Sequence, residues 1–216
     1  MRMNRKIPAA MFFLVFSLFL LSGADRFSFS ADRTEAVLSQ GKERTVLTGS
    51  ARVETGKTVI NADKIELYGD DFRFVVCTGS IVVRDEEQGF ILYSRNLFFD
   101  RERELTRVQG YTEMLDQKHS MVVKGSYLEN LGDENISIIQ IGVRILKEDE
   151  DGSTMVCRAE YALYNRDTDL LELSGMPRVT WKGDEYAASR ISINLETDEI
   201  TMEGKVSGTI YSETEE

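Results

Sequence analysis

Residues 59–83 read VINADKIELYGDDFRFVVCTGSIVV and contain one repeat unit of the chain. An alternating run is followed by the polar turn Gly69-Asp70-Asp71, and a second alternating run carries Gly79. Glycine favours tight reversals because it tolerates unusual backbone angles, and aspartate favours them because it bonds to its own main chain. The segment therefore predicts a β-hairpin.

A glycine set in an alternating run returns about every thirty residues. The spacings are 30, 31, 32, 33 and 29 residues, and these anchor glycines are Gly49, Gly79, Gly110, Gly142, Gly175 and Gly204. Self-similarity at this period is typical of stacked supersecondary units, which bury an apolar face only when several units are in register. We expect the glycines to mark places where a strand bends or another backbone comes close.

The runs around these glycines alternate between apolar and polar residues. Ile191 and Ile193, for example, point one way, whereas Arg190 and Ser192 point the other. A period of two is typical of strands with one dry and one wet side, and helical periodicity is absent beyond residue 24 apart from short stretches near 97–104. Pro177, the one proline in that part of the chain, is expected at an edge or a bulge.

Two architectures fit such an array: a β-solenoid with parallel coils, or antiparallel hairpins that curl into a jelly roll or an open barrel. The short charged turns favour the antiparallel version, since parallel neighbours need long crossovers. The predicted fold is therefore all-β, a curled antiparallel sheet or β-jelly roll of about five hairpin repeats. Its predicted divisions are a signal peptide or N-terminal anchor at 1–24, a linker and first strand at 25–44, the β-repeat domain at 45–211 and an acidic tail at 212–216.

The first residues have the pattern of an export signal. Arg2, Arg5 and Lys6 form a positive region, and residues 7–21 are an apolar run without charge. Small residues at 22–24 provide a cleavage site, with 28–30 as a second candidate. We expect cleavage and a periplasmic protein; the alternative is an uncleaved anchor, since the run is close to the roughly 17 residues that a spanning helix needs.

Composition limits the partners of the chain. Hydrophobic residues make up 42% of it, so a real core is expected. The formal net charge is −11, and without residues 1–24 the chain would carry 23 basic against 37 acidic residues, a charge of −14. Nucleic acid is therefore excluded as a partner, and docking of a basic patch on an anionic membrane is disfavoured. Solubility is the simplest use of this charge.

Residues that could carry catalysis or bind a metal are missing from the sequence. The single histidine, His119, excludes a two-histidine metal site, and neither a Gly-x-Ser-x-Gly elbow nor a phosphate-binding loop is present. The acidic run 148–151 lies in a predicted turn, where solvated charge is the ordinary use and calcium binding the alternative. We predict no enzyme, no cofactor and no metal. Cys77 and Cys157 are expected as buried thiols, with a disulfide as the alternative.

The repeat resembles that of the OstA/LptA-like family, which reads approximately as an Ala-Asp-x-hydrophobic strand, an acidic turn and an apolar-x-Gly-Asn-Val strand. Residues 59–67 and 74–85 carry the resemblance, and the pattern returns at 93–97 with Gly110, at 157–161 with 171–175 and at 188–191 with 202–206. It spans roughly residues 45–210. The third repeat, around 124–128, is degenerate, and the asparagine usual after the glycine is replaced by Ser50, Ser80, Tyr111, Val143, Met176 and Lys205. The chain looks like a divergent member.

The resemblance implies a periplasmic jelly roll that binds the acyl part of lipopolysaccharide and stacks end to end to bridge two membranes. The implied partners are lipopolysaccharide or another glycolipid, further copies of the chain head to tail, and inner- and outer-membrane transport components. A curled sheet with one apolar face gives a physical reason, because each buried methylene contributes roughly 0.8 kcal/mol. The candidate groove residues are Val59, Ile65, Leu67, Phe74, Ile139, Ile141, Tyr161, Leu163, Ile191, Ile193, Met202 and Val206.

Two other interpretations stay open. The chain could be an inner-membrane-anchored, LptC-like component of the same transport system, with residues 7–24 in the bilayer. It could also be a structural or adhesive β-repeat protein with a dry core and no ligand, as an acidic surface without a recognisable binding motif would allow. At each candidate position the sequence leaves open whether the side chain lines a groove or fills a packed core.

Overall fold

A computed structural model describes residues 27–37, 39, 42–87, 89–117, 120–149, 151–197 and 199–211. The predicted signal segment, His119 and the acidic tail 212–216 lie outside these residues. In the described part, sixteen β-strands form one antiparallel sheet, and the short 3-10 turn η1 (Asp70–Phe72) is the only helical element. No helix there has the length and apolar character needed to cross a bilayer. The predicted fold class, an all-β curled antiparallel sheet, is confirmed.

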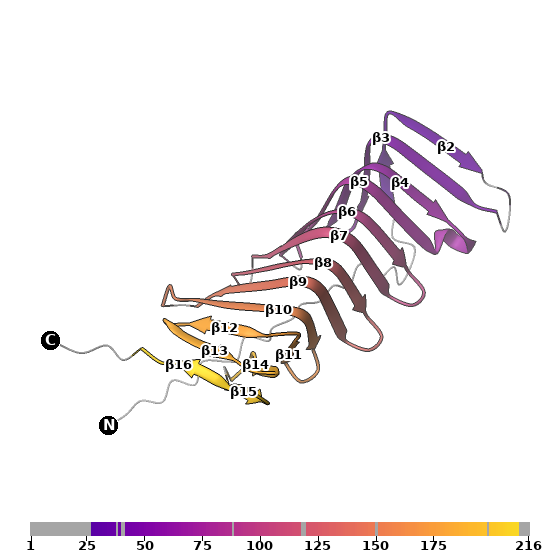
Figure 1. The fold of residues 1–216 in the computed structure, drawn as a ribbon. Coiled ribbons are helices and arrows are strands. Elements are labelled where there is room, and N and C mark those ends of the chain that lie inside the picture. Colours follow the sequence, from indigo (N-terminus) through magenta and orange to yellow (C-terminus); the bar gives the residue numbers. More distant parts are fainter. Residues whose placement is uncertain are drawn as a thin grey trace, which may run out of the picture.

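Eight long strands pair in chain order and form the body of the molecule (Figure 1). They are β3 (Arg44–Thr55), β4 (Thr58–Tyr68), β5 (Phe74–Asp85), β6 (Phe90–Asp100), β7 (Leu105–Asp116), β8 (Met121–Leu131), β9 (Ile136–Glu148) and β10 (Thr154–Asn165). Shorter strands extend the sheet at both ends: β1 (Phe27–Ser30), β2 (Arg33–Val37), β11 (Leu170–Ser174), β12 (Arg178–Trp181), β13 (Asp184–Ala187), β14 (Arg190–Asn194), β15 (Glu199–Glu203) and β16 (Ser207–Thr209).

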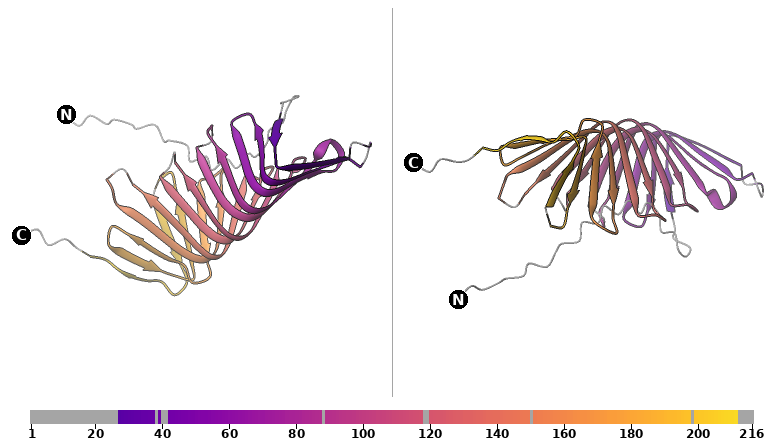
Figure 2. Two further views of the ribbon diagram at one scale, coloured as in Figure 1. Left: turned by 90° about the horizontal axis from the view of Figure 1, so that it is seen from above. Right: turned by 60° about the horizontal axis from the view of Figure 1, so that its bottom comes forward.

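The long strands bend near their middle, so that the sheet curves around a trough with two arms (Figure 2). Arm A contains β2, β11, β14 and β15, arm B contains β1, β12, β13 and β16, and β3–β10 contribute one half to each arm. At the start of the sheet, β1 and β2 pair with opposite halves of β3. At the other end, β11 and β12 pair with opposite halves of β10. Both ends of the trough are thus built from strands interrupted at the bend.

The bends lie at the anchor glycines. Cross-strand register shifts between Thr48 and Ala51 in β3 and between Thr78 and Ile81 in β5, and the other long strands shift likewise. A φ between 65° and 95° is shared by Gly49, Gly79, Gly110, Gly142, Gly175 and Gly204. This left-handed region favours glycine because glycine has no Cβ. The prediction that these glycines mark bends is confirmed.

Acidic side chains of neighbouring strands support two of the bends. Asp63 of β4 accepts a hydrogen bond of 3.1 Å from the backbone N–H of Ser80, and Glu160 of β10 accepts one of 3.3 Å from the N–H of Gly142. A Cβ built on Gly79 would overlap the Asp63 carboxylate. Position 79 therefore requires glycine for two reasons: its positive φ, and the space that the Asp63 carboxylate fills.

The turns between strands are joined along the two rims of the trough by backbone hydrogen bonds of 2.9 to 3.3 Å. On the arm A rim, an N–H of each turn donates to a carbonyl of the turn before it, in the pairs Arg101 to Arg73, Gly132 to Glu104, Arg166 to Asn135 and Leu195 to Asp169. On the arm B rim, the corresponding pairs are Glu86 to Lys57, Gln117 to Gly89 and Glu148 to Ser120. Each rim is therefore continuous from hairpin to hairpin.

The inner side of both arms forms one hydrophobic core. Cys77 on arm A and Cys157 on arm B are free, buried thiols within it, and burial raises the pKa of each to about 12. Pro177 lies in the gap between β11 and β12, where a missing backbone donor costs no ladder bond.

Candidate functional site

The trough is lined by unbroken rows of apolar side chains that are cross-strand neighbours. On arm A the row of buried residues is Leu47, Ile65, Cys77, Leu97, Val108, Leu128, Ile139, Ala162, Leu173 and Ile191. On arm B it is Val53, Ile60, Val83, Leu92, Met114, Val123, Ile145, Cys157 and Val179. Side chains opposite each other on neighbouring strands lie about 5 Å apart, so each row is a continuous apolar strip along the trough.

The structure brings half of the sequence-predicted groove residues together on arm A. Ile65, Leu67, Ile139, Ile191 and Ile193 are buried on its inner side. Met202, on the terminal strand β15, is half-buried and packs against the same core. These residues lie on four strands, β4, β9, β14 and β15, so hairpins far apart in the chain share one interior.

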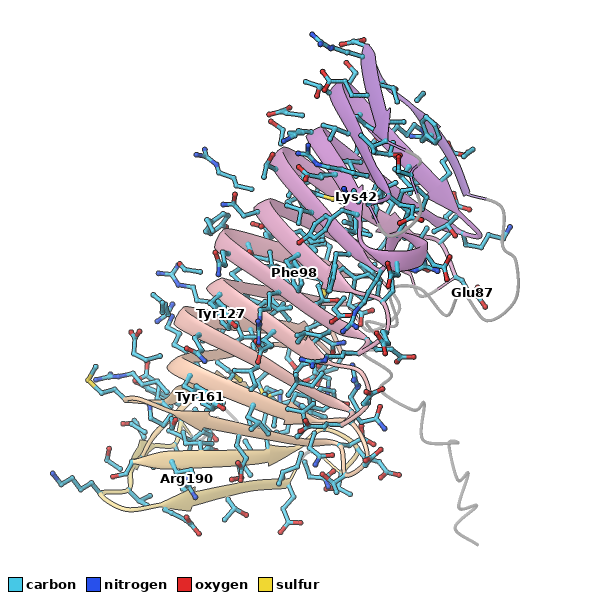
Figure 3. All side chains as sticks on the ribbon, turned by 90° about the vertical axis from the view of Figure 1, so that its right-hand side faces the viewer. Lys42, Glu87, Phe98, Tyr127, Tyr161 and Arg190 are labelled. Carbon is cyan, nitrogen blue, oxygen red and sulfur yellow. The ribbon has the colours of Figure 1, made fainter. Side chains whose placement is uncertain are left out.

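The other six candidates lie away from the inner side of the arms. Val59, Phe74, Tyr161 and Leu163 alternate with buried neighbours and lie half-buried on the outer side of the arms. Tyr161 shares its outer row with Tyr127, and both are labelled in Figure 3. Ile141 and Val206 are exposed, at 58% and 54%, the first at a bend with φ 65° and the second beyond β15.

For Val59, Tyr161 and Leu163 the bends cause this division, because the bends of β4 and β10 change which residues face inward. In β4 the buried residues are Ile60 and Ala62 before the bend but Ile65 and Leu67 after it, so the alternation shifts by one position. An alternation extended through the bend therefore assigns the wrong face to one half of the strand. The Ala-Asp pair on β4 and the glycine on its neighbour are the sequence signals that could have located the shift.

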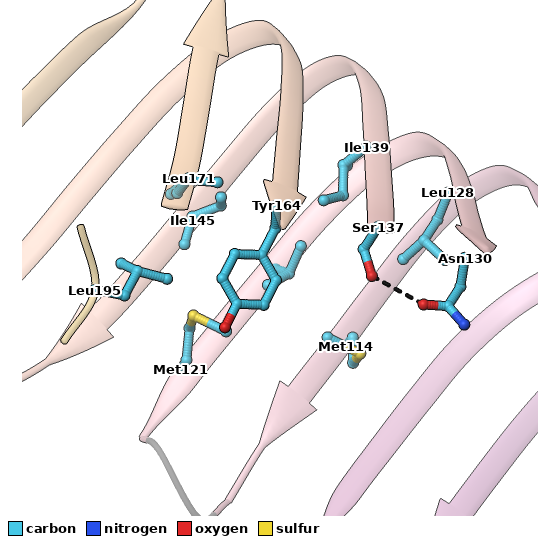
Figure 4. Close-up of a pocket in the computed structure, with 11 residues that line it drawn as sticks. Met114, Met121, Leu128, Asn130, Ser137, Ile139, Ile145, Tyr164, Leu171 and Leu195 are labelled. Carbon is cyan, nitrogen blue, oxygen red and sulfur yellow. Dashed lines mark hydrogen bonds between the residues drawn. The ribbon is translucent and has the colours of Figure 1, made fainter. Parts of the chain in front are cut away.

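Buried side chains of both arms belong to one core. A hollow between the arms has a volume of about 30 Å³, close to one water molecule and far below the roughly 300–1,000 Å³ of ordinary ligand pockets. It lies over β7–β11 (Figure 4), and its lining is Met114, Met121, Val123, Leu128, Asn130, Ser137, Ile139, Ile145, Tyr164, Leu171 and Leu195. An acyl chain fits this interior only if the arms move apart.

Charged groups close the rim of arm A near its N-terminal end. Arg73 donates two hydrogen bonds, of 2.8 and 2.6 Å, to the buried carboxylate of Asp100. The guanidinium lowers the pKa of Asp100. On the other rim, the hydroxyl of Thr58 donates to the Asp85 carboxylate at 2.5 Å. The apolar rows are thus bordered by polar groups where the arms end.

A run of polar side chains interrupts the inner surface at the arm A rim, beside the hollow. Thr106, Asn130, Ser137 and Tyr164 are consecutive cross-strand neighbours on β7 to β10, and all four are buried. Ser137 donates to Asn130 Oδ1 at 2.9 Å, as Figure 4 shows, and Arg166 donates to the same oxygen at 2.6 Å. Burial lowers the pKa of Arg166 and raises that of Tyr164, whose hydroxyl donates to Asp169 at 2.7 Å.

A comparison with family models identifies the family of the chain. The model of the family described as LptA/(LptD N-terminal domain) LPS transport protein matches residues 30–199. The chain belongs to this family. The match runs from the end of β1 to the start of β15 and contains five of the six anchor glycines, so the resemblance of the repeats to the OstA/LptA-like family is confirmed.

One solved structure is also similar to this LPS transport family member, but more weakly than the family model is. LptH, the LptA homologous periplasmic component of the lipopolysaccharide transport device from Pseudomonas aeruginosa, is 11% identical, with 87% of this chain and 96% of that chain covered. The TM-score is 0.29, and the assignment of the chain to its family depends on the family model alone. A search of curated proteins finds no match.

The candidate site of this LPS transport family member is the apolar inner side of the two arms. Among the residues that the structure describes, no group of three or more His, Cys, Asp or Glu side chains could hold a metal ion. What the trough offers chemically is a surface for hydrocarbon along its length and, at one rim, a short series of hydrogen-bonding groups.

Proposed function

We propose that the chain is a periplasmic carrier that holds the acyl part of lipopolysaccharide, or of a related amphiphilic glycolipid, in the trough and passes it toward the outer membrane. The observation that carries this proposal is the pair of facing apolar rows, which run without a polar interruption from Leu47 to Ile191 on arm A and from Val53 to Val179 on arm B. Membership of the LPS transport protein family supports it.

Burial of hydrocarbon supplies the driving force for uptake. An acyl chain that buries about six methylenes gains roughly 5 kcal/mol before any cost is subtracted. Parting the arms exposes the two apolar rows and loses their contacts across the trough, and the entering chain covers the same side chains again. Binding is favourable when the hydrocarbon restores more contact than the parting removes.

Each arm would move as a unit about the bends. Hydrogen bonds between turns hold each rim together, and the anchor glycines give the bends between the arms their backbone freedom. The inner side of the bends is lined by small residues such as Ala51, Ala62, Gly125 and Ala159, which leave little side-chain bulk to resist a change of angle.

Contacts with other proteins would be made at the ends of the trough. In the part of the chain that the structure describes, β2 and β15 pair on one side only, so each offers an edge to another strand. Head-to-tail association of copies, and contacts with inner- and outer-membrane transport components, would use these edges. A line of copies would extend the apolar rows beyond one molecule.

A second candidate, a structural β-repeat protein without a ligand, is favoured by one observation. The hollow of about 30 Å³ is what a core filled by its own side chains would show. The two candidates differ in whether hydrocarbon reaches the inner rows in the cell.

Photocrosslinking in native membranes tests the proposal. A photoreactive residue at position 193 replaces a buried isoleucine of the trough, and the matched control at position 141 replaces an exposed isoleucine at a bend. We expect a lipid adduct, identified by mass spectrometry, at 193 and none at 141. Equal labelling at both positions, or none at either, would favour the structural alternative. The N-terminus found by the same mass spectrometry distinguishes a cleaved carrier from an anchored, LptC-like component, which would keep residue 1 or 2.

A further inference from the structure

The polar run at the arm A rim is out of place in an apolar interior. At the same depth in the trough, the neighbouring strands carry Leu67, Val75 and Phe99 on one side of the run and Leu171 and Ile193 on the other. All five of these side chains are buried. The run therefore occupies the middle of a row that is apolar on both sides of it.

One member of the run has an unused hydrogen-bonding group. Thr106 is 0% exposed, and its hydroxyl oxygen has no hydrogen-bond partner among the described residues. A hydroxyl buried in this way costs free energy, and valine has nearly the same shape without that cost. A threonine at this position is explained if its hydroxyl has a partner in another state of the protein.

The rest of the run is held in a fixed arrangement. Asn130 Oδ1 accepts from both Ser137 and Arg166, so its amide is locked in one orientation. Arg166 also donates to the carbonyl of Leu131 at 3.3 Å, which places its guanidinium across the tip of the arm. Burial lowers the pKa of Arg166, and Tyr164, Asp167 and Glu104 are the charged or titratable groups that act against this effect. Polar groups fixed before binding lose little entropy when a ligand arrives.

The hollow is lined by three of the four polar residues, and Thr106 is the cross-strand neighbour of one of them, Asn130. Asn130, Ser137 and Tyr164 line it on one side, whereas Met114 and Met121 line it from arm B. A ligand that enters here meets hydrocarbon surface inside and hydrogen-bonding groups at the rim. The chemical group that matches this boundary is the ester or amide carbonyl at which an acyl chain joins its headgroup.

We propose that the buried hydroxyl of Thr106, beside Asn130 in the polar run, donates a hydrogen bond to the ester or amide carbonyl of an acylated glycolipid, with the acyl chain in the adjacent hollow and the headgroup outside the arm A rim. The proposal depends on the lipid-carrying function proposed above and adds to it the orientation of the lipid. The hydroxyls of Ser137 and Tyr164 already donate to Asn130 and Asp169, so the donor for the carbonyl is the Thr106 hydroxyl, and its strand lies about 4.8 Å from that of Asn130.

Two probes separate this site from the apolar trough as a whole. The first is a lipid A preparation, whose chains carry ester and amide groups, and the second is diphenylhexatriene, a fluorescent hydrocarbon without oxygen. Thr106→Val removes the hydroxyl with little change of shape, and Thr106→Ser keeps it. The matched control is Thr45→Val, because Thr45 lies in the same row at β3, beside Leu67 and away from the polar run.

The expected result is a selective loss. Thr106→Val weakens binding of lipid A about fivefold to tenfold, the effect of one hydrogen bond, and leaves binding of diphenylhexatriene and the unfolding midpoint of the free protein no lower than in the wild type. Thr106→Ser and Thr45→Val bind both probes as the wild type does. The proposal is overturned if Thr106→Val leaves lipid A binding unchanged or weakens both probes equally, since the second outcome indicates a packing defect. A wild-type protein that binds neither probe overturns the carrier function itself.

Discussion

Substitution of Gly79 by alanine tests how the bends are built. At φ 95° an L-residue is strained by roughly 1–2 kcal/mol, and the added Cβ would overlap the Asp63 carboxylate. Asp63 then has to turn away and lose its hydrogen bond to the N–H of Ser80, which contributes roughly another 1.5 kcal/mol. We expect Gly79→Ala to destabilise the protein by about 3 kcal/mol in total. For a domain of this size that corresponds to a fall in Tm of roughly 6–12 °C.

Another anchor glycine provides the matched control. Gly142 has φ 66°, but a Cβ built on it meets nothing within 4 Å, so Gly142→Ala carries the backbone strain alone, roughly 1–2 kcal/mol. Urea denaturation monitored by circular dichroism measures both variants. In an Asp63→Ala background the additional cost of Gly79→Ala should shrink to that of Gly142→Ala. If the two glycine substitutions are equally destabilising, or if the cost at position 79 does not depend on Asp63, the supporting role of the Asp63 carboxylate at this bend is refuted.

Three further predictions concern the core and the rims. Leu128→Ala, on the inner row, should destabilise by about 2–5 kcal/mol in urea denaturation, whereas Leu163→Ala, on the outer side, should cost less than about half as much; similar losses would contradict the assignment of faces. Arg73 lowers the pKa of Asp100 in the folded protein. The ionised carboxylate therefore stabilises the fold at pH values above the ordinary aspartate pKa near 4, and this contribution is lost as the pH falls through the lowered pKa of the folded state. Asp100→Asn should be less stable than the wild type at pH 7, and the difference in stability should narrow in acid. Burial raises the pKa of Cys77 and Cys157 to about 12, so a thiol reagent at pH 8 should label both within minutes in urea but hardly at all in the folded protein; rapid labelling without denaturant would contradict their burial.

The hairpin in residues 59–83 could be predicted closely. The structure has strands at 58–68 and 74–85, with η1 between them, because the polar turn and the alternation on either side of it act locally. The predicted turn at 148–151 also falls between strands, because β9 ends at Glu148 and β10 begins at Thr154. Local turn chemistry and the period of two were sufficient for the fold class and the direction of the sheet.

On strands such as β4 and β10, the inner face was predictable only up to the bend, where the buried positions shift by one. In β9, Ile139, Ile141 and Val143 are in phase in the sequence, but Ile141 is exposed, because it lies at the bend with φ 65°, whereas Ile139 and Val143 on either side of it are buried. The supporting contact between Asp63 and Ser80 joins neighbouring strands, so no single run of sequence contains it.

The closeness of the two arms was also beyond the sequence. Alternation indicates which side chains face inward but carries no information about how far they reach across the trough, and this distance determines the volume of the hollow. The polar run has the same origin, since Thr106, Asn130, Ser137 and Tyr164 lie far apart in the chain and become neighbours only through strand pairing.

The bonds from turn to turn have a consequence for how such a chain can evolve. Because each turn is tied only to the adjacent ones, duplication or deletion of a whole hairpin of about thirty residues would leave every remaining tie with an equivalent mate. Relatives could then differ in the number of hairpins while the cross-section of the two arms stays constant. The length of a single molecule along the trough would then increase with the number of hairpins that its gene encodes.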